Sequence, residues 1–195
     1  LMVIIIVGGT CLTSLITLAI LGAFSTVLQN LFALCLLYSA LGIRDLGAHS
    51  MRVWNKLKRN QLQAARRAVS MIVGRDTASL DEAGITRATV ETVAENAVDG
   101  VIAPMFFMFL AGPVGAITYK AVNTLDSTFG YKTLELRDFG WASARFDDIV
   151  NWLPARLSVP CFIIAAMLMK YDYHQALNCV LEHAHKHASP NAGLP

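Results

Sequence analysis

The N-terminal stretch decides the fold class: residues 1–43, LMVIIIVGGTCLTSLITLAILGAFSTVLQNLFALCLLYSALGI, contain no charged side chain. A helix needs about 20 apolar residues to cross a bilayer. The stretch is therefore long enough for two transmembrane helices, which we predict at about residues 2–22 and 27–43. The polar residues Ser25, Thr26, Gln29 and Asn30 mark the turn between them.

Composition supports the same class. Of the 195 residues, 55% are hydrophobic and only 15% are charged, whereas soluble domains average roughly 25% charged residues. This excludes a disordered chain and argues against a simple soluble domain. The net charge of +2 is too small to favour a nucleic-acid partner. No segment shows strand alternation, so we predict an all-α integral membrane protein, with residues 1–195 forming a single membrane-embedded domain within a longer chain.

Two further apolar runs follow, at residues 100–119 and 157–169. The second is short for a span, and we predict a short transmembrane helix there, with Arg156 and Lys170 reaching the two interfaces. Residues 170–195 form the tail. Its histidines at 183, 185 and 187 are more typical of solvated side chains than of a metal site. The four cysteines show no metal-type spacing and are expected to be buried thiols.

Residues 44–99 form a polar segment between the spans. Its first part, residues 44–75, carries eight basic residues and one acid, Asp45. Such an excess beside a span marks the cytoplasmic side. Apolar residues from Trp54 to Ile72 recur at helical spacing, which predicts one amphipathic helix lying near the inner leaflet or packed on the spans. A capping box at 79–82 predicts a short helix ending at Gly84, and Thr86 can cap the next helix.

That next helix carries Glu91, Glu95 and Asp99 at i, i+4 and i+8, so their carboxylates share one face. Asn96 lies beside them. A solvated surface stripe is the plain interpretation. A magnesium site is the sharper one, because the helix runs into an apolar segment, where ionisable groups are expensive, and Mg²⁺ prefers oxygen ligands.

A second set of polar residues fills 120–156. Lys120, Asn123 and Asp126, with Ser127, can share a helical face just after the apolar run. Further along, Asp147 and Asn151 are spaced i, i+4. Arg145 and Asp148 can form an ordinary ion pair.

The two sets can form one site only if the chain returns to the side from which it entered. If residues 100–119 cross the bilayer once, Asp99 and Lys120 lie on opposite sides. Gly112-Pro113-Val114-Gly115 interrupts this run, and these residues break helices. The alternatives are a kinked span and a re-entrant helical hairpin, which would bring the carboxylates and Lys120 to one face.

A resemblance narrows the function. The runs that carry it cover nearly the whole chain: DL at 45–46 with His49, IVGRDT at 72–77, VETVAEN at 90–96, DG at 99–100, AP at 103–104, YKAVNTLDS at 119–127, GYK at 130–132, FG at 139–140, SARFDD at 143–148, Asn151, PAR at 154–156 and SPNAG at 189–193. In this order they resemble the CobD/CbiB family of cobalamin (vitamin B12) biosynthesis, the adenosylcobinamide-phosphate synthases. Ala188 and Leu194 depart from it, where the family usually has proline and tryptophan. Family members also extend beyond both ends of this chain.

The resemblance implies a multi-pass enzyme of the inner cell membrane whose active site faces the cytoplasm. It implies ATP-dependent amide ligation of aminopropanol, usually as its phosphate, to a propionate carboxyl of the corrinoid adenosylcobyric acid. ATP and Mg²⁺ are the implied cofactors. Partners would be the two substrates, the lipid bilayer and other membrane enzymes of late cobalamin assembly, with no nucleic acid.

Roles follow from this chemistry. The expected metal ligands are Glu95, Asp99 and Asp126. The expected catalytic groups are Glu95, Lys120, Asp126, Asp147 and Asp148. The expected substrate- or phosphate-binding residues are Arg75, Asn96, Asn123, Arg145, Asn151 and Asn191. The alternative function is a membrane corrinoid-binding scaffold or transporter without ligase chemistry, since transporters also contain interrupted apolar helices.

Overall fold

The computed structural model describes residues 1–74, 76–130, 137–183, 191 and 194, with only the backbone at 137–139 and 183. Every regular element in these ranges is helical, which confirms the all-α prediction. The chain divides into two compact units, residues 1–41 with 99–195, and residues 42–98. That the whole chain forms a single membrane-embedded domain stays a prediction.

Three helical stretches within the described residues are long and apolar enough to cross a membrane: Met2–Phe24, Thr26–Leu57 and Glu82–Phe129. A fourth is added if Gly140–Val150 and Trp152–Leu168, which meet at a 48° bend, form one span. Large apolar side chains on these stretches are exposed, for example Phe24 and Phe109, each at 80%. Such surface fits contact with lipid and therefore a membrane protein.

The first unit begins with α1 (Met2–Phe24) and α2 (Thr26–Ala40), at the positions predicted for two spans. Hydroxyls inside α1 bond back to the helix, such as Thr17 Oγ1 to the carbonyl of Thr13 at 2.8 Å. Polar side chains are thereby satisfied without water. Both helices pack on α6 (Ala103–Phe129), which holds the largest share of the buried residues.

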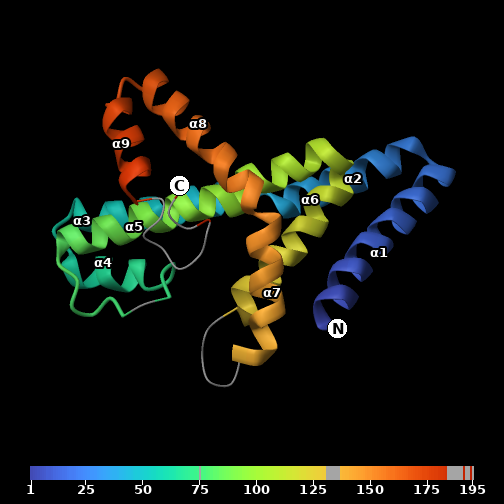
Figure 1. Ribbon diagram of the computed structural model, residues 1–195, viewed down its shortest axis with the longest axis horizontal. Helices are drawn as coiled ribbons and strands as arrows, with labels where there is room; N and C mark the ends of the chain where they lie inside the picture. Colours follow the sequence, from blue (N-terminus) through green and yellow to red (C-terminus); the bar gives the residue numbers. More distant parts are fainter. Residues whose placement is uncertain (75, 131–136, 184–190, 192–193, 195) are drawn as a thin grey trace. The chain divides into compact units, whose positions relative to one another are not determined.

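The path of α6 reverses near its middle (Figure 1). Ala111 and Gly112 leave helical geometry, and Gly112 has φ 62° and ψ −155°, a conformation open essentially to glycine alone. Phe107 and Tyr119 would lie about 18 Å apart along a straight helix. Their rings instead stack with centroids 5.2 Å apart. A Cβ on Gly115 would overlap the carbonyl of Phe107, so glycine permits this close approach of the two halves.

The remaining helices of this unit are α7 (Arg137–Val150), α8 (Trp152–Leu168) and α9 (Tyr173–His183). Helix α7 packs on α6, where Gly140 lies so close to the carbonyl of Phe129 that a Cβ would overlap it. Helix α8 begins at Trp152, five residues before the predicted span. The guanidinium of Arg156 lies 4.2 Å from the centre of the Trp152 ring. This cation–π contact stabilises the charge of Arg156, so the helix can include this residue.

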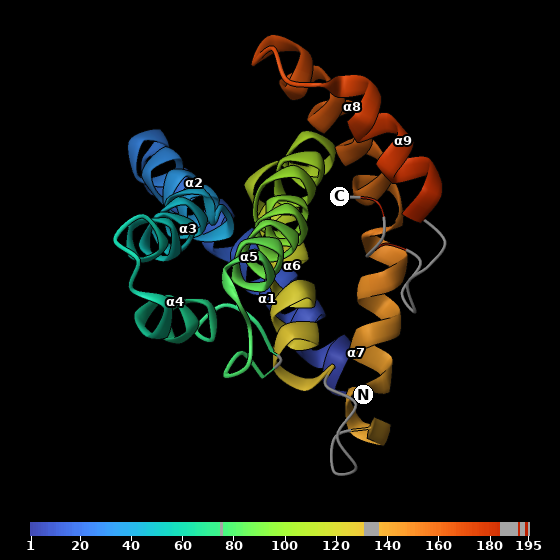
Figure 2. The same cartoon turned by 90° about the vertical axis from the view of Figure 1, so that its left-hand side faces the viewer.

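The second unit is a bundle of α3 (Ile43–Leu57), α4 (Leu62–Val69) and α5 (Glu82–Ala97), seen nearly end-on in Figure 2. Its core consists of Val53, Ala65, Val69, Ile85 and Ala88. The single helix predicted from Trp54 to Ile72 is wrong. The chain turns at Asn60, whose φ of 54° is left-handed, a conformation that asparagine tolerates better than most residues.

Two smaller predictions are corrected. Helix α5 begins at Glu82 with Asp81 as its cap, because the Asp81 carboxylate accepts from the Gly84 amide at 2.7 Å. Gly84 and Thr86 therefore lie inside one helix. The prediction of buried thiols is wrong for Cys35, Cys161 and Cys179, which are exposed. Cys35 and Cys161 sit on the apolar helices α2 and α8, and nearby sequence hydrophobicity does not tell an outward from an inward face.

Candidate functional site

A buried hydrogen-bonded cluster lies at the junction of α6, α7 and α8, with Asn151 at its centre. Asn151 is 3% exposed. Its side-chain oxygen accepts from the Tyr119 hydroxyl at 2.8 Å. Its amide nitrogen donates to Asp147 at 2.9 Å and to Asp99 at 3.2 Å. Asn151 therefore holds groups from both ends of the apolar run in one place.

The two carboxylates reach this cluster by different routes. Asp147 lies on α7, one turn before Asn151, at the i, i+4 spacing read from the sequence. Asp99 lies in a short π-helical turn, Val98–Ile102, that precedes α6. Such wide turns are frequent at functional sites. One oxygen of Asp147, Oδ1, is buried with no hydrogen-bond partner among the described atoms, which leaves it able to accept a bond.

The cluster is strongly acidic. Asp99, Asp126 and Asp148 all interact electrostatically with Asp147. Asp126 is half-buried on the second half of α6, and Asp148 is 25% exposed. Arg145 lies 3.9 Å from Asp148 and forms the ion pair that the sequence suggested. A cluster of carboxylates of this kind attracts a cation or an ammonium group.

Cationic and amide groups stand beside these carboxylates. The Lys120 ammonium donates to the side-chain oxygen of Asn123 at 3.3 Å. Asn123 is buried and Lys120 is half-buried. Both follow Tyr119 on the same half of α6. The predicted face of Lys120, Asn123 and Asp126 therefore belongs to the same unit as the Asn151 cluster, and Asp126 interacts electrostatically with Asp147.

Magnesium is the cation to test against this geometry. Mg²⁺ is usually held by one or two carboxylates together with water and substrate phosphates. Asp99 and the open oxygen of Asp147 supply that kind of donor set. Within the described ranges, no three histidine, cysteine, aspartate or glutamate side chains gather closely enough to hold a metal ion. The donors present thus fit an ion shared with a phosphate rather than an ion caged by protein.

Two residues expected to bind substrate serve another purpose in the structure. Asn151 uses its side-chain bonds within the protein. Asn191 of the tail donates to the backbone carbonyl of Asp148 at 2.8 Å and accepts from Arg156 at 3.2 Å. It ties the tail to α7 and α8. Both amides therefore position other groups in this structure, and their roles in substrate binding stay predictions.

Three further predicted residues lie elsewhere. Glu95 and Asn96 are exposed on α5, in the unit of residues 42–98, and the Asn96 amide bonds to the carbonyl of Thr92 at 2.8 Å. Their roles stay predictions. Arg75 lies outside the described residues, as do His185 and His187 and the side chain of His183.

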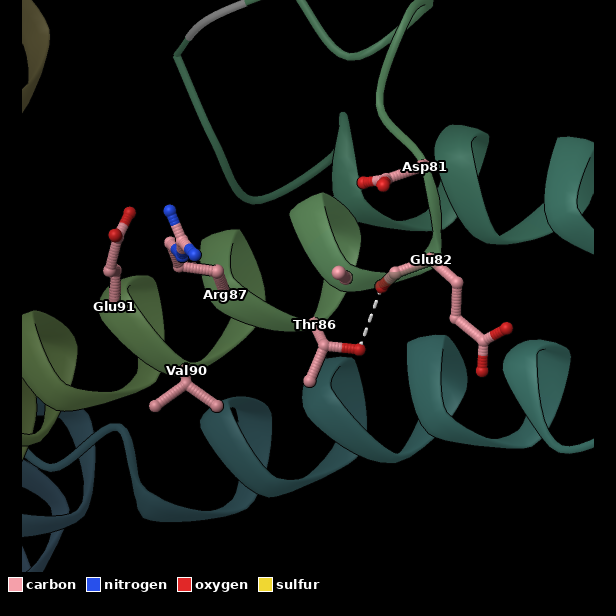
Figure 3. Close-up of a pocket in the computed structure, with 7 residues that line it drawn as sticks. Asp81, Glu82, Thr86, Arg87, Val90 and Glu91 are labelled. Carbon is pink, nitrogen blue, oxygen red and sulfur yellow. Dashed lines mark hydrogen bonds between the residues drawn. The ribbon is translucent and has the colours of Figure 1, made fainter.

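The same unit carries a shallow pocket along α5 (Figure 3). Its lining residues are Asp81, Glu82, Ala83, Thr86, Arg87, Val90 and Glu91. Figure 3 shows Arg87 and Glu91 projecting from the same side of the helix, one turn apart. Of the predicted carboxylate stripe only Glu91 lines this pocket, so the stripe does not define a single site there.

Sequence reasoning missed Tyr119. Tyr119 is 2% exposed. Its ring stacks on Phe107 and so joins the two halves of α6, and its hydroxyl bonds to Asn151, the residue that precedes α8. One signal was available: its hydroxyl ends an apolar run and stands four residues before Asn123, on the same helical face.

The fold and this cluster define a helical protein, fit for the membrane, with a buried polar site between its helices. The chain belongs to the CobD/CbiB family, because the family model described as CobD/Cbib protein matches residues 1–195. No solved structure matches the chain.

Curated relatives agree. The cobalamin biosynthesis protein CobD of Photorhabdus laumondii is 45% identical over 190 residues, which are 97% of this chain and 60% of that protein. The protein of the same name from Yersinia enterocolitica is 51% identical over 156 residues, 80% of this chain and 49% of that protein. The protein of the same name from Geobacter metallireducens is 48% identical over 158 residues, which are 81% of this chain and 50% of that protein. The chain thus spans about half to three fifths of the relatives that it matches.

Proposed function

We propose that the protein joins aminopropanol, usually as its phosphate, to a propionate carboxyl of adenosylcobyric acid in an ATP-dependent amide ligation. Family membership supports a role in cobalamin biosynthesis. The observation that carries the finer proposal is the Asn151 cluster. It gathers carboxylates from three segments, Asp99, Asp126 and Asp147, and the same unit carries the Lys120–Asn123 pair on α6. Such a set of anionic and cationic groups suits an amine and a phosphate in one reaction.

The reaction needs two steps. A carboxylate is a poor electrophile, so a propionate oxygen attacks the terminal phosphorus of ATP, and ADP leaves. The amine nitrogen then attacks the acyl carbon of the resulting acyl phosphate, and phosphate leaves as the amide forms. Catalysis of this kind depends chiefly on positioning the reactants and neutralising charge.

The described residues fit these tasks. Lys120 neutralises phosphate charge, and Asn123 orients the Lys120 ammonium. Mg²⁺, when bound by Asp99 and the open oxygen of Asp147, would offset the charge of the nucleotide phosphates. Because that oxygen of Asp147 would then hold the ion, Asp148 is the base that accepts the proton released by the attacking amine, with Asp126 as the next candidate. The roles of Glu95 in metal binding and of Arg145 in phosphate binding are retained as weaker parts of the proposal.

The proposal includes a re-entrant hairpin at residues 100–119 that enters and leaves the membrane on one side. Its support is the reversal at Gly112 and the convergence of Asp99 and Tyr119 on Asn151. Irregular backbone at membrane depth is tolerated where protein buries it. The proposal also puts this side in the cytoplasm and the protein in the inner membrane. Its support is the basic excess of residues 44–75, since such an excess beside a span is typical of the cytoplasmic side.

The test uses the whole protein, with any sequence beyond residues 1–195, purified in detergent. It is incubated with adenosylcobyric acid, aminopropanol phosphate and Mg-ATP, and the mass of the corrinoid is followed. We expect the mass of the amide product, and none without ATP. Glu95→Gln and Lys120→Ala should lower turnover. A folded protein that binds the corrinoid without converting it would contradict the ligase and favour the scaffold or transporter, whose support is the interrupted apolar run.

A further inference from the structure

Helix α3 presents three chemically distinct faces. Val53 is 1% exposed and packs in the core of its unit. Leu46 and Leu57 lie on the same buried side, half-buried. Side chains on the opposite half of the helix are exposed, among them Ile43, Met51 and Trp54. That outer half is neither uniformly polar nor uniformly apolar, and its pattern is informative.

The first outer face is apolar. Ile43, Met51 and Trp54 are 57%, 52% and 56% exposed. At 100° per residue they fall within an arc of about 80°. Gly47, inside the same arc, adds no polar group. Three large apolar side chains, more than half exposed on one narrow strip, mark a surface that contacts something other than water.

The second outer face is basic. Arg44 and Arg52 are exposed and lie about 20° and 100° beyond the apolar strip on the same wheel. Lys58, the C-terminal cap of α3, is also exposed, within the apolar arc at the end of the helix. Asp45, the single acid of α3, lies about 120° beyond the strip and about 20° from Arg52 on the wheel, about two turns from Arg52 along the helix. An apolar strip bordered by cations, with a tryptophan on it, is the arrangement of a helix that lies in a membrane interface.

The chain path agrees with that location. Within the candidate span Thr26–Leu57 the charged residues begin only at Arg44, so the uncharged part is α2, which ends at Ala40, and α3 begins three residues later, at Ile43. Two residues cannot carry the chain far from the bilayer at that point, since an extended residue spans at most about 3.6 Å. The start of α3 therefore lies at the depth of the headgroups, where an exposed apolar strip and cations both find complementary partners.

We propose that the outer face of α3 docks on anionic lipid headgroups, with Ile43, Met51 and Trp54 in the acyl boundary and Arg44 and Arg52 paired to lipid phosphates. The partner is an anionic bilayer surface rather than a soluble protein. The short connection from α2 to α3 favours the bilayer. Charge complementarity then favours anionic over zwitterionic lipid, because zwitterionic lipid would satisfy the apolar strip alone, whereas the basic face requires net negative charge.

The test uses the whole protein in nanodiscs that contain brominated phosphatidylglycerol or brominated phosphatidylcholine at equal mole fraction. Subtracting the quenching of Trp54→Phe from that of the unchanged protein isolates the signal of Trp54. We expect both lipids to quench this signal, and the anionic lipid to do so at a lower mole fraction. The preference should weaken in high salt, because exposed charges are screened.

Variants separate charge from fold. Arg52→Glu should raise the mole fraction of anionic lipid needed for half-quenching by at least about fivefold, from the usual contribution of one basic residue near an anionic surface. Arg52→Gln, which replaces the glutamate variant if that variant fails to fold, should give a smaller change of the same sign. Arg87→Glu, on α5 of the same unit, changes net charge equally and should leave the preference unchanged.

Two results would overturn the proposal. Absence of Trp54 quenching by either lipid would show that protein covers this face. Equal quenching by both lipids would show that the basic face recognises no headgroup.

Discussion

The hydroxyl of Tyr119 donates a 2.8 Å hydrogen bond to the side chain of Asn151, and the same asparagine donates to Asp99. Asp99 and Tyr119 bracket the apolar run of residues 100–119. A straight helix would separate them by about 30 Å. Their shared partner therefore means that the two ends of this run meet, and the site depends on that meeting.

Replacing Asn151 tests whether it positions the cluster. Asn151→Ala leaves the Tyr119 hydroxyl and two carboxylates without their buried partner. Each such loss costs about 1–3 kcal/mol, so we expect the free energy of unfolding to fall by at least about 2 kcal/mol and the apparent Tm in detergent to fall with it. Ser158→Ala, a buried change on α8 whose hydroxyl bonds only to the carbonyl of Ala155, should shift Tm much less. Equal shifts would mean that Asn151 holds nothing together.

Tyr119 makes two separable interactions. Tyr119→Phe keeps the ring on Phe107 and removes the hydrogen bond, which should cost about 0.5–1.5 kcal/mol. Tyr119→Ala also removes the buried ring and should cost about 3–5 kcal/mol, as for other large aromatic residues. Thermal unfolding of both variants measures the difference. A Phe variant as unstable as the Ala variant would show that the hydroxyl, not the stack, dominates.

Gly112 has a backbone conformation that other residues avoid. Gly112→Ala introduces no steric contact, because no atom lies within 4 Å of the added Cβ. The cost is backbone strain alone, about 1–3 kcal/mol. Gly8→Ala on α1 is the matched control, since its Cβ also meets nothing within 4 Å and its backbone is helical. The control should be neutral or slightly stabilising. Indistinguishable unfolding of the two variants would contradict the reversal at Gly112.

Lys120 tests the phosphate role. Lys120→Ala should lower kcat/KM for the ATP-dependent ligation by about 100-fold, the usual loss when one charge-stabilising group is removed. Lys120→Arg should restore part of the rate, because it keeps the charge. Arg87→Ala on α5 should leave the rate unchanged. Turnover is measured by corrinoid mass, and unaltered turnover in Lys120→Ala would remove this residue from the mechanism.

The fold was largely predictable because uncharged runs of about 20 residues leave few options. Helices α1 and α2 followed from residues 1–43. The sequence did not predict the helix break at Asn60, because apolar periodicity continues across it. It did not predict Asp81 as the cap of α5 either, because Ser79 is an equally plausible cap. These choices depend on packing in the bundle around Val53 and Ile85.

The site was predictable in composition but not in roles. The i, i+4 spacing identified Asp147 with Asn151, and the helical face of Lys120 and Asn123 was also evident. The sequence could not show that the side chain of Asn151 forms its hydrogen bonds with other residues of the protein. The role of Tyr119 was missed as well, because its one available signal, a hydroxyl at the end of an apolar run and four residues before Asn123, is too common to identify a site residue.

The central claim is that both ends of the run at 100–119 lie on one side of the membrane. The test uses a protein whose native cysteines are removed and three variants of it, each with one cysteine, at Asn96, Thr124 or Thr26. The introduced cysteine reports the side of the membrane on which that position lies. All three parent side chains are exposed. Reconstituted in vesicles and treated with an impermeant maleimide, positions 96 and 124 should react together. Position 26, at the far end of α2, should react from the other side. Labelling of 96 and 124 from opposite sides would contradict the hairpin and the single site built on it.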